Sequence, residues 1–304
     1  MGSVMRVPHP IPYQGSKRGL AARILGTLPR ASGRLIEPFA GSAAVTLAAA
    51  ARRAFSHYVI ADALEPLAGI WRLIISAPDV LASRYADLWM MQLNDPRATY
   101  TRIRTEFNSV GEPALLLYLL ARCVKAAIRF NSQGEFNQSP DNRRLGMRPE
   151  VMRREIMGAH ALLRGCAEAH AADFRAVAAD ATTEDVVYMD PPYEGVTGLR
   201  DRRYYIAPSF SREELICELD CLNTRGVPFV LSYDGACGDR KYGGELPAEL
   251  ELLKLSVPAG RSAQSTLMGR AEITVESLYV SPTARDALFR CGPVLRPPVQ
   301  MPLP

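Results

Sequence analysis

Two blocks of alternating strand and helix patterns, separated by a long and mostly helical stretch, constrain the fold more than any other feature of the sequence. In each block, short apolar runs that end in polar or glycine-containing turns alternate with segments of helical periodicity. Such alternation predicts an α/β fold with a largely parallel sheet. We predict strands at 34–37, 57–61, 185–189 and 227–231, and helices at 43–51, 64–75 and 212–223.

The helical stretch between the blocks reads as an insertion into the sheet domain. It runs from about Pro78 to Leu163, with one helix predicted over 114–130 and a polar break after it. Two late strands, at 251–257 and 272–280, are predicted to form an antiparallel pair, and the proline-rich end reads as a poorly ordered tail. The predicted division is 1–77 and 165–281 for the two parts of the sheet domain, 78–164 for the insertion, and 282–304 for the tail.

Composition places the chain among ordinary globular proteins, because 48% of its 304 residues are hydrophobic and 22% are charged. Six scattered cysteines and the lack of a signal-like start favour a reducing compartment, so we expect a cytoplasmic protein. No apolar run approaches the roughly 20 residues that a membrane-spanning helix needs, and we expect no membrane partner. The spacing of the histidines and cysteines predicts no metal site.

A strand-to-helix turn near the N-terminus has the features of a nucleoside site. Pro38-Phe39-Ala-Gly41-Ser42 follows the first strand, and Asp62 ends the next strand 21 residues after Gly41. That offset is close to the roughly 20 residues at which an acid meets ribose hydroxyls in nucleotide-binding sheets. A diphosphate loop needs three glycines, whereas this turn has one, so we expect a nucleoside cofactor without a diphosphate. An ordinary tight turn with a helix-capping acid is the alternative.

The tetrapeptide Asp190-Pro191-Pro-Tyr193 follows an apolar strand and is the most informative motif. Two successive prolines fix φ, so the carboxylate of Asp190 and the carbonyl of Pro191 are held at set positions. Two such acceptors can grip the two hydrogens of an exocyclic amine, and the ring of Tyr193 can stack on a planar base. A rigid strand-ending turn with a core aromatic is the alternative. Ser232-Tyr-Asp234 ends another strand and is a candidate for the lining of the same pocket.

Positive charge is concentrated inside the insertion. Residues 122–154 contain eight basic and three acidic residues, a net +5, against +4 for the whole chain. This excess is the electrostatic pattern expected for contacts with nucleic-acid phosphates, and the interleaved amide side chains can read adenine edges. A solvated basic face is the alternative. The candidate DNA-binding residues are Arg129, Asn131, Asn137, Arg143 and Arg144.

Together these motifs resemble the Dam-like, alpha-group DNA N6-adenine methyltransferases that use S-adenosyl-L-methionine. The resemblance rests on Tyr13-Gln-Gly-Ser-Lys17, Glu37-Pro-Phe-Ala-Gly41, Asp62 and Asp190-Pro-Pro-Tyr193 in this order, with the insertion before the last motif. The segment 129–137 and the closing strand at 271–279 are also similar to the family. The likeness covers about residues 11–280.

The resemblance implies a role for each matching residue. Tyr13 and Lys17 would border the cofactor and the incoming base, and Phe39 and Gly41 would wrap the cofactor. Asp62 would hold the ribose. Relatives often carry Asn two residues after this acid, where this chain has Leu64. The cofactor-binding set is Tyr13, Lys17, Phe39, Gly41, Asp62 and Asp190, and the catalytic set is Asp190, Pro191 and Tyr193.

The family implies a Rossmann-like methyltransferase sheet with a target-recognition insertion, acting on double-stranded DNA. The methyl group would pass to N6 of an adenine flipped out of the duplex, which costs a few kcal/mol. Transfer to cytosine N4, or a catalytically idle nucleoside- or DNA-binding module of the same fold, are the alternatives. The recognition sequence, the oligomeric state, a companion restriction endonuclease and the role of Asp190 as a base stay open.

Overall fold

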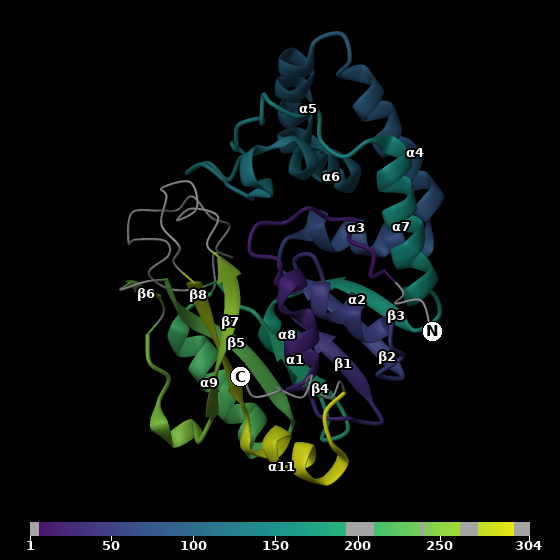
Figure 1. The fold of residues 1–304 in the computed structure, drawn as a ribbon. Helices are drawn as coiled ribbons and strands as arrows, with labels where there is room; N and C mark the ends of the chain where they lie inside the picture. Colours follow the sequence, from purple (N-terminus) through teal and green to yellow (C-terminus); the bar gives the residue numbers. More distant parts are fainter. Residues whose placement is uncertain (1–5, 193–209, 238–239, 243, 262–272, 295–304) are drawn as a thin grey trace, which may run out of the picture.

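The computed structural model describes residues 6–192, 210–237, 240–242, 244–261 and 273–294. One sheet with strand order β3-β2-β1-β4-β5-β8-β7 forms the larger part of the molecule, and a helical lobe lies beyond one edge of it (Figure 1). The short strand β6 pairs with β5. The strands are β1 (Arg34–Glu37), β2 (His57–Asp62), β3 (Ala167–Ala171), β4 (Val186–Met189), β5 (Phe229–Cys237), β6 (Arg240–Tyr242), β7 (Leu253–Arg261) and β8 (Ile273–Val280).

The α/β prediction is confirmed, and so is the antiparallel pairing of the two late strands. From β3 to β5 the strands are parallel, whereas β8 runs antiparallel to both β5 and β7. Strand β3 was not predicted: it forms an edge strand with the sequence Ala-Glu-Ala-His-Ala, which lacks the β-branched and aromatic residues that mark strands.

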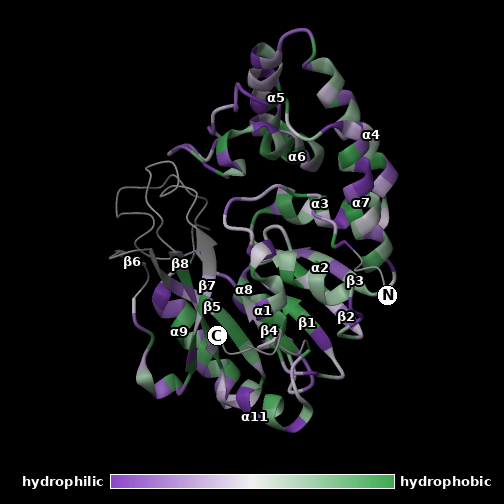
Figure 2. Ribbon diagram, viewed as in Figure 1, coloured by the Kyte–Doolittle hydropathy of each residue, from purple (hydrophilic) through white to green (hydrophobic). Residues whose placement is uncertain are grey.

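Alternation along the strands divides the apolar side chains between two cores. Leu35, Tyr188 and Val230 point to one face, where α1 (Ala21–Leu25), α2 (Ala44–Ala50) and α3 (Glu65–Ser76) cover them. Their neighbours in sequence point to the other face, against α8 (Phe174–Ala179) and α9 (Arg212–Thr224). Figure 2 shows the hydrophobic colour along the central strands. Each fully buried large side chain contributes about 1.5–3 kcal/mol.

The helical lobe contains α5 (Pro96–Val110) and α6 (Pro113–Arg122), and α4 (Pro78–Met91) and α7 (Pro149–Leu163) run side by side from it toward the sheet (Figure 1). All four helices begin with proline, which suits the first helical position because no N–H is needed there. The predicted helix over 114–130 is wrong beyond Arg122. There Cys123 is extended, and Lys125 and Ala126 have left-handed φ values of 62° and 51°.

The expectation of a poorly ordered segment from residue 282 onward is wrong for the part that the structure describes. Helix α11 (Pro282–Cys291) begins at Ser281, whose hydroxyl accepts from the backbone N–H of Ala284 at 3.2 Å and of Phe229 at 3.0 Å. A serine cap followed by proline outweighs the proline-rich composition. Residues 295–304 lie outside the described part. Among the described residues, no helix combines the length and apolarity needed to cross a membrane.

Candidate active site at the carboxyl edge of the sheet

The strand order reverses between β1 and β4. From β1 the chain proceeds to β2 on one side, and from β4 it proceeds to β5 on the other. The carboxyl ends of β1 and β4 therefore flank the switch point, where ligands bind in open α/β sheets. Glu37 ends β1 and Asp190 directly follows β4, so the Pro38–Ser42 turn and the Asp190-Pro-Pro motif meet there.

A row of polar side chains lies along this edge, on the face that α1 and α2 cover. Glu37, Asp190 and Ser232 each stand two residues after a side chain buried on that face, and Glu276 stands two residues before one. The pairing of Met189 with Leu231 brings Asp190 beside Ser232. The hydroxyl of Ser232 is fully buried. Four adjacent strands thus contribute one polar group each.

Lys17 ties this row together. It lies in the short helix η1 (Lys17–Gly19), and only 8% of it is exposed. Its Nζ is 3.0 Å from Oδ1 of Asp190 and 3.4 Å from Oε2 of Glu276. Of the two acids, Asp190 was a predicted site residue, whereas sequence reasoning assigned Glu276 no role. The available signal was an acid in a strand position that otherwise faces the core.

Glu37 is buried and links the end of β1 to α2 by hydrogen bonds. Its Oε2 accepts from the backbone N–H of Thr46 at 3.0 Å and from the Thr46 hydroxyl at 2.5 Å. Burial raises the pKa of Glu37 to about 8, and the nearby charge of Asp190 adds to the rise. Glu37 is therefore largely neutral at pH 7, which spares the edge a further negative charge.

The turn after β1 is closely packed by predicted site residues. Gly41 has a φ of 49°, and a Cβ there would lie 3.0 Å from the ring of Tyr13. Only glycine suits both the left-handed backbone and this contact. The Gly41 carbonyl accepts from the indole N–H of Trp71 at 3.0 Å. Tyr13, Gly41 and Asp62 are thus brought together, since the Gly41 N–H donates to Asp62.

Asp62 presents a half-buried acceptor at the end of β2. Its Oδ2 accepts from Gly41 N–H at 3.1 Å and its Oδ1 from Leu64 N–H at 3.0 Å. Burial raises the pKa of Asp62 to about 6, and the two hydrogen bonds oppose that rise. Each oxygen can accept one more hydrogen bond, which suits a pair of neighbouring hydroxyls. At position 64, where relatives often carry Asn, the backbone N–H holds this acid.

Phe39 belongs to an aromatic group beside this turn. Its ring stacks on Phe174 with centroids 5.0 Å apart and meets Phe210 edge-on at 5.8 Å. Phe174 begins α8 directly after β3, the strand that sequence reasoning missed. Pro191 is buried, whereas the Asp190 side chain remains 21% exposed. Tyr193 lies outside the described residues.

Three candidate DNA-binding residues lie on a hairpin of the helical lobe, which an isolated bridge between Phe130 and Phe136 closes. Asn131 forms its turn: its Oδ1 accepts from the N–H groups of Gln133 and Glu135, and its Nδ2 donates to the Glu135 carboxylate. Asn137 is exposed, and its N–H donates to the Arg129 carbonyl at 3.0 Å.

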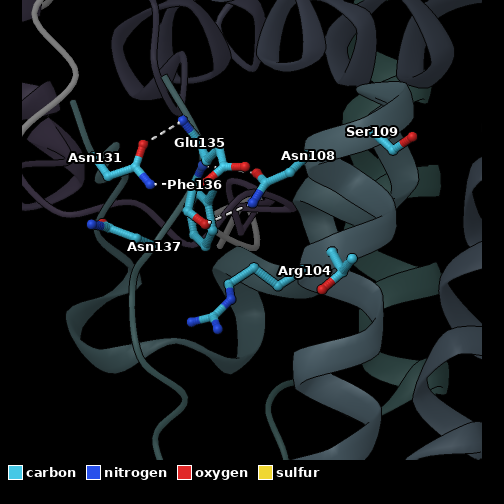
Figure 3. Close-up of a pocket in the computed structure, with 8 residues that line it drawn as sticks. Arg104, Asn108, Ser109, Asn131, Glu135, Phe136 and Asn137 are labelled. Atoms are coloured by element: carbon cyan, nitrogen blue, oxygen red, sulfur yellow. Dashed lines mark hydrogen bonds between the residues drawn. The ribbon is translucent and has the colours of Figure 1, made fainter. Parts of the chain in front are cut away.

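A cavity of about 460 Å³ lies between this hairpin and α5 (Figure 3). Asn108 of α5 fixes the hairpin, since its amide group accepts from Phe136 N–H at 2.8 Å and donates to the Phe136 carbonyl at 3.1 Å. Arg104, Asn131 and Asn137 line the same hollow. The hairpin is therefore held against a helix, with its polar side chains around an open cavity.

Arg143 and Arg144 are exposed to solvent, and both side chains contact the carboxylate of Asp141. Asp141 accepts from Arg143 Nε at 3.2 Å and from Arg144 Nη2 at 2.9 Å, yet the two arginine side chains are 82% and 75% exposed. The backbone N–H of Arg143, together with the two arginine side chains, holds the pKa of Asp141 at about 2, well below its usual range. The arrangement presents two cations on a short, ordered loop.

Arg122, one of the eight basic residues of the positive segment, is not part of its surface. It is 2% exposed, and its Nη1 donates to the carbonyls of Asp141, at 2.9 Å, and of Arg144. Gln138 is similarly buried and donates to the Val124 carbonyl. Both side chains organise the loop from within.

Within the described part of the chain, no group of three or more His, Cys, Asp or Glu side chains is arranged to hold a metal ion. An α/β sheet with an acid held by two prolines at its switch point, and with a half-buried acceptor at the end of β2, defines a candidate transferase site. Comparison with known proteins identifies its class.

The chain belongs to the D12 class N6 adenine-specific DNA methyltransferase family, which it matches over residues 13–257. It is 29% identical to the retron Ec67 DNA adenine methylase of Escherichia coli, over 72% of this chain and 75% of that protein. It is 28% identical to the DNA adenine methylase of Escherichia coli strain K12, over 72% and 78%. The DNA N-6-adenine-methyltransferase of Escherichia phage P1 is 28% identical over 74% of this chain, but the match spans only 29% of that protein. The chain is thus a DNA adenine-N6 methyltransferase, which requires a methyl donor and DNA.

Proposed function

We propose that the methyl donor is S-adenosyl-L-methionine and that the acceptor is N6 of an adenine flipped out of double-stranded DNA. The observation that carries this proposal is the topology: Asp190 follows β4 and the Pro38–Ser42 turn follows β1, so both lie at the switch point, and Gly41 of that turn donates to Asp62. An acceptor for an amine, after β4, and an acceptor for a nucleoside sugar, at the end of β2, thus flank the end of β1.

The residues around the turn fit a nucleoside donor. The Asp62 carboxylate has one free acceptor position on each oxygen for ribose hydroxyls, and the missing Cβ at Gly41 lets the ring of Tyr13 pack against the turn. The rings of Tyr13 and Phe39 supply flat apolar surfaces beside it. When bound, the donor supplies a methyl group on a positively charged sulfur.

Charge at the edge suits such a cationic group. Lys17 offsets one of the two carboxylates that it contacts, so the group Asp190, Glu276 and Lys17 has a net charge of about −1. A buried negative site binds a cation more tightly than the neutral molecule left after methyl transfer. The same residues therefore favour the donor over the spent product.

Asp190 and Pro191 would bind the target amine. The Asp190 carboxylate and the Pro191 carbonyl each accept one N6 hydrogen, which favours a pyramidal nitrogen whose lone pair points to the methyl group. Most of the rate acceleration would then come from orientation and electrostatics. The nitrogen loses a proton during or after transfer, and Asp190 is its first acceptor. Tyr193 remains the expected stacking partner for the base.

Residues 78–164 would form the target-recognition unit, with Arg129, Asn131, Asn137, Arg143 and Arg144 at the DNA. The exposure of Arg143 and Arg144 supports phosphate contacts. Asn137 lies open at the cavity beside α5, whereas the amide of Asn131 is used within its turn and would act by shaping the hairpin.

The test is transfer of tritium from methyl-labelled S-adenosyl-L-methionine to a duplex library that contains all short sequence contexts. Digestion should yield labelled N6-methyladenine and no labelled N4-methylcytosine. A duplex in which every adenine is replaced by purine, which lacks the amine, is the matched control and should stay unlabelled. Label in cytosine, or donor binding without any transfer, would contradict the proposal.

A further inference from the structure

We propose that Glu276 is a positioning residue that takes over the Lys17 ammonium from Asp190 when the target amine binds. This inference rests on the proposed function, and it adds a residue and a charge movement to it. Lys17 would then serve Asp190 as a removable counter-ion and not as a permanent partner.

The position of Glu276 makes such an exchange short. It lies on β8, which pairs with β5, and Asp190 follows β4 on the other side of β5. Lys17 reaches between them, with Nζ 3.0 Å from Asp190 and 3.4 Å from Glu276. A small rotation of the lysine side chain changes which carboxylate it binds more closely.

Glu276 is incompletely paired in the present arrangement. Its Oε2 is shielded from solvent and makes no hydrogen bond with any described residue, and the contact with Lys17 is an ion pair without hydrogen-bond geometry. A buried carboxylate oxygen without a hydrogen bond is costly, by about 1–3 kcal/mol. This oxygen would gain its missing partner in a state in which Lys17 has moved toward it.

Asp190 has the opposite need. In the present arrangement its Oδ1 faces the Lys17 ammonium. During methyl transfer the attacking nitrogen becomes positively charged, and a cation on the accepting carboxylate opposes that charge. Movement of Lys17 toward Glu276 frees Oδ1 for the amine. The Asp190 carboxylate can then stabilise the positive charge that develops on the attacking nitrogen. Because the ammonium stays paired throughout, no buried cation is left alone.

Within the described residues, Asp190 and Glu276 are the acids whose carboxylates lie within 4.0 Å of the Lys17 ammonium. Glu37 is not among them, and its Oε2 already accepts two hydrogen bonds from Thr46. Glu276 is therefore the alternative ion-pair partner of Lys17 when the target amine binds Asp190.

The test compares Glu276→Gln, Glu276→Asp and wild-type protein in single-turnover methyl transfer with saturating donor and duplex DNA. Glu276→Gln leaves the displaced ammonium without a charged partner, so the transfer rate should fall about tenfold to a hundredfold. Donor affinity, measured by calorimetry without DNA, should fall by a smaller factor than the transfer rate, since this substitution changes only the net charge beside the donor. Glu276→Asp keeps the charge and should recover much of the lost rate. Glu249→Gln, at an exposed site, is the matched control.

Glu276→Gln is then combined with Lys17→Met and compared with Lys17→Met alone. If Glu276 acts through Lys17, Glu276→Gln costs no further rate there. Three outcomes would overturn this inference and leave the proposed function standing. They are equal transfer rates for Glu276→Gln and wild type, an undiminished loss of rate from Glu276→Gln in the Lys17→Met background, and no recovery of rate by a folded Glu276→Asp. A wild-type protein that methylates no DNA would overturn the proposed function, and this inference with it.

Discussion

The edge of the sheet and the helical lobe handle polar groups in opposite ways. At the edge, Lys17, Glu37 and Asp190 are mostly shielded from solvent, and the ion pair of Lys17 with Asp190 joins residues far apart in sequence. In the lobe, Arg143 and Arg144 are largely exposed and bond to an acid two or three residues away. Burial makes each edge interaction strong and specific. The exposed arginines of the lobe, in contrast, can exchange their contacts with Asp141 for contacts with phosphates.

This difference predicts that substitutions at the edge have large effects on methyl transfer, and that substitutions on the lobe surface have small effects on DNA binding. Results in this order would support the comparison, and results in the reverse order would contradict it.

The largest effect is expected at Asp190. Asp190→Asn keeps the shape but replaces the anionic acceptor with a neutral amide, so methyl transfer should fall about a thousandfold in single turnover. Donor binding without DNA should weaken by a much smaller factor, because the proposed donor contacts at Gly41 and Asp62 lie at the ends of β1 and β2. A variant that transfers methyl within tenfold of wild type would show that the edge does not act as a charged acceptor.

A large effect on stability is expected at Arg122, the buried exception within the lobe. Arg122→Met leaves the carbonyls of Asp141 and Arg144 without this donor, which should lower the free energy of unfolding by about 2–4 kcal/mol. Chemical denaturation measures the change. Arg164→Met, at an exposed arginine, should stay within about 0.5 kcal/mol of wild type. Equal effects would place Arg122 among the surface charges.

Glu37 should make stability depend on pH. Its pKa is raised from 4.5 to about 8 by burial, so the folded chain holds this proton more tightly than the unfolded chain. The resulting stabilisation is complete below about pH 4.5 and is lost as the pH rises to about 8.

Glu37→Gln removes that titration. Relative to wild type, the variant should therefore gain a few kcal/mol between pH 5 and pH 8, as measured by urea unfolding at each pH. A constant difference between the two proteins across this range would mean that Glu37 is ionised throughout. Glu249→Gln, at an exposed site, is the matched control for the substitution itself.

The smallest effect is expected at Arg143 and Arg144. Replacing both with alanine should weaken DNA binding several-fold and reduce the slope of its salt dependence by about one to two. Fluorescence anisotropy at several salt concentrations measures both quantities, and the thermal midpoint should stay near that of wild type. An unchanged slope would remove this loop from the DNA interface.

Much of the sheet could be predicted from the sequence because its strands are locally marked. The strands at 34–37, 57–61 and 185–189 are apolar runs that end in turns, and the structure forms strands there within one residue. Strand β3 carried no such mark, since it is a small-residue edge strand. Helix α11 was missed because of the proline-rich sequence that follows it, although Ser281 followed by Pro282 is a helix start.

The candidate site could be predicted in its parts but not in its pairing. Spacing after strand ends placed Gly41, Asp62 and Asp190 at one edge. The ion pairs of Lys17 join segments more than 170 residues apart, at Asp190 and Glu276, and no local pattern encodes them. In the positive segment, residue type alone could not tell buried Arg122 from exposed Arg143.

A crystal structure with cognate duplex DNA and an unreactive donor analogue tests the central claim most directly. The account predicts an extruded adenine whose N6 lies about 3 Å from a carboxylate oxygen of Asp190, with Lys17 drawn onto Glu276. An Asp190 carboxylate still held by Lys17, with the adenine amine bound elsewhere or left in the duplex, would contradict it.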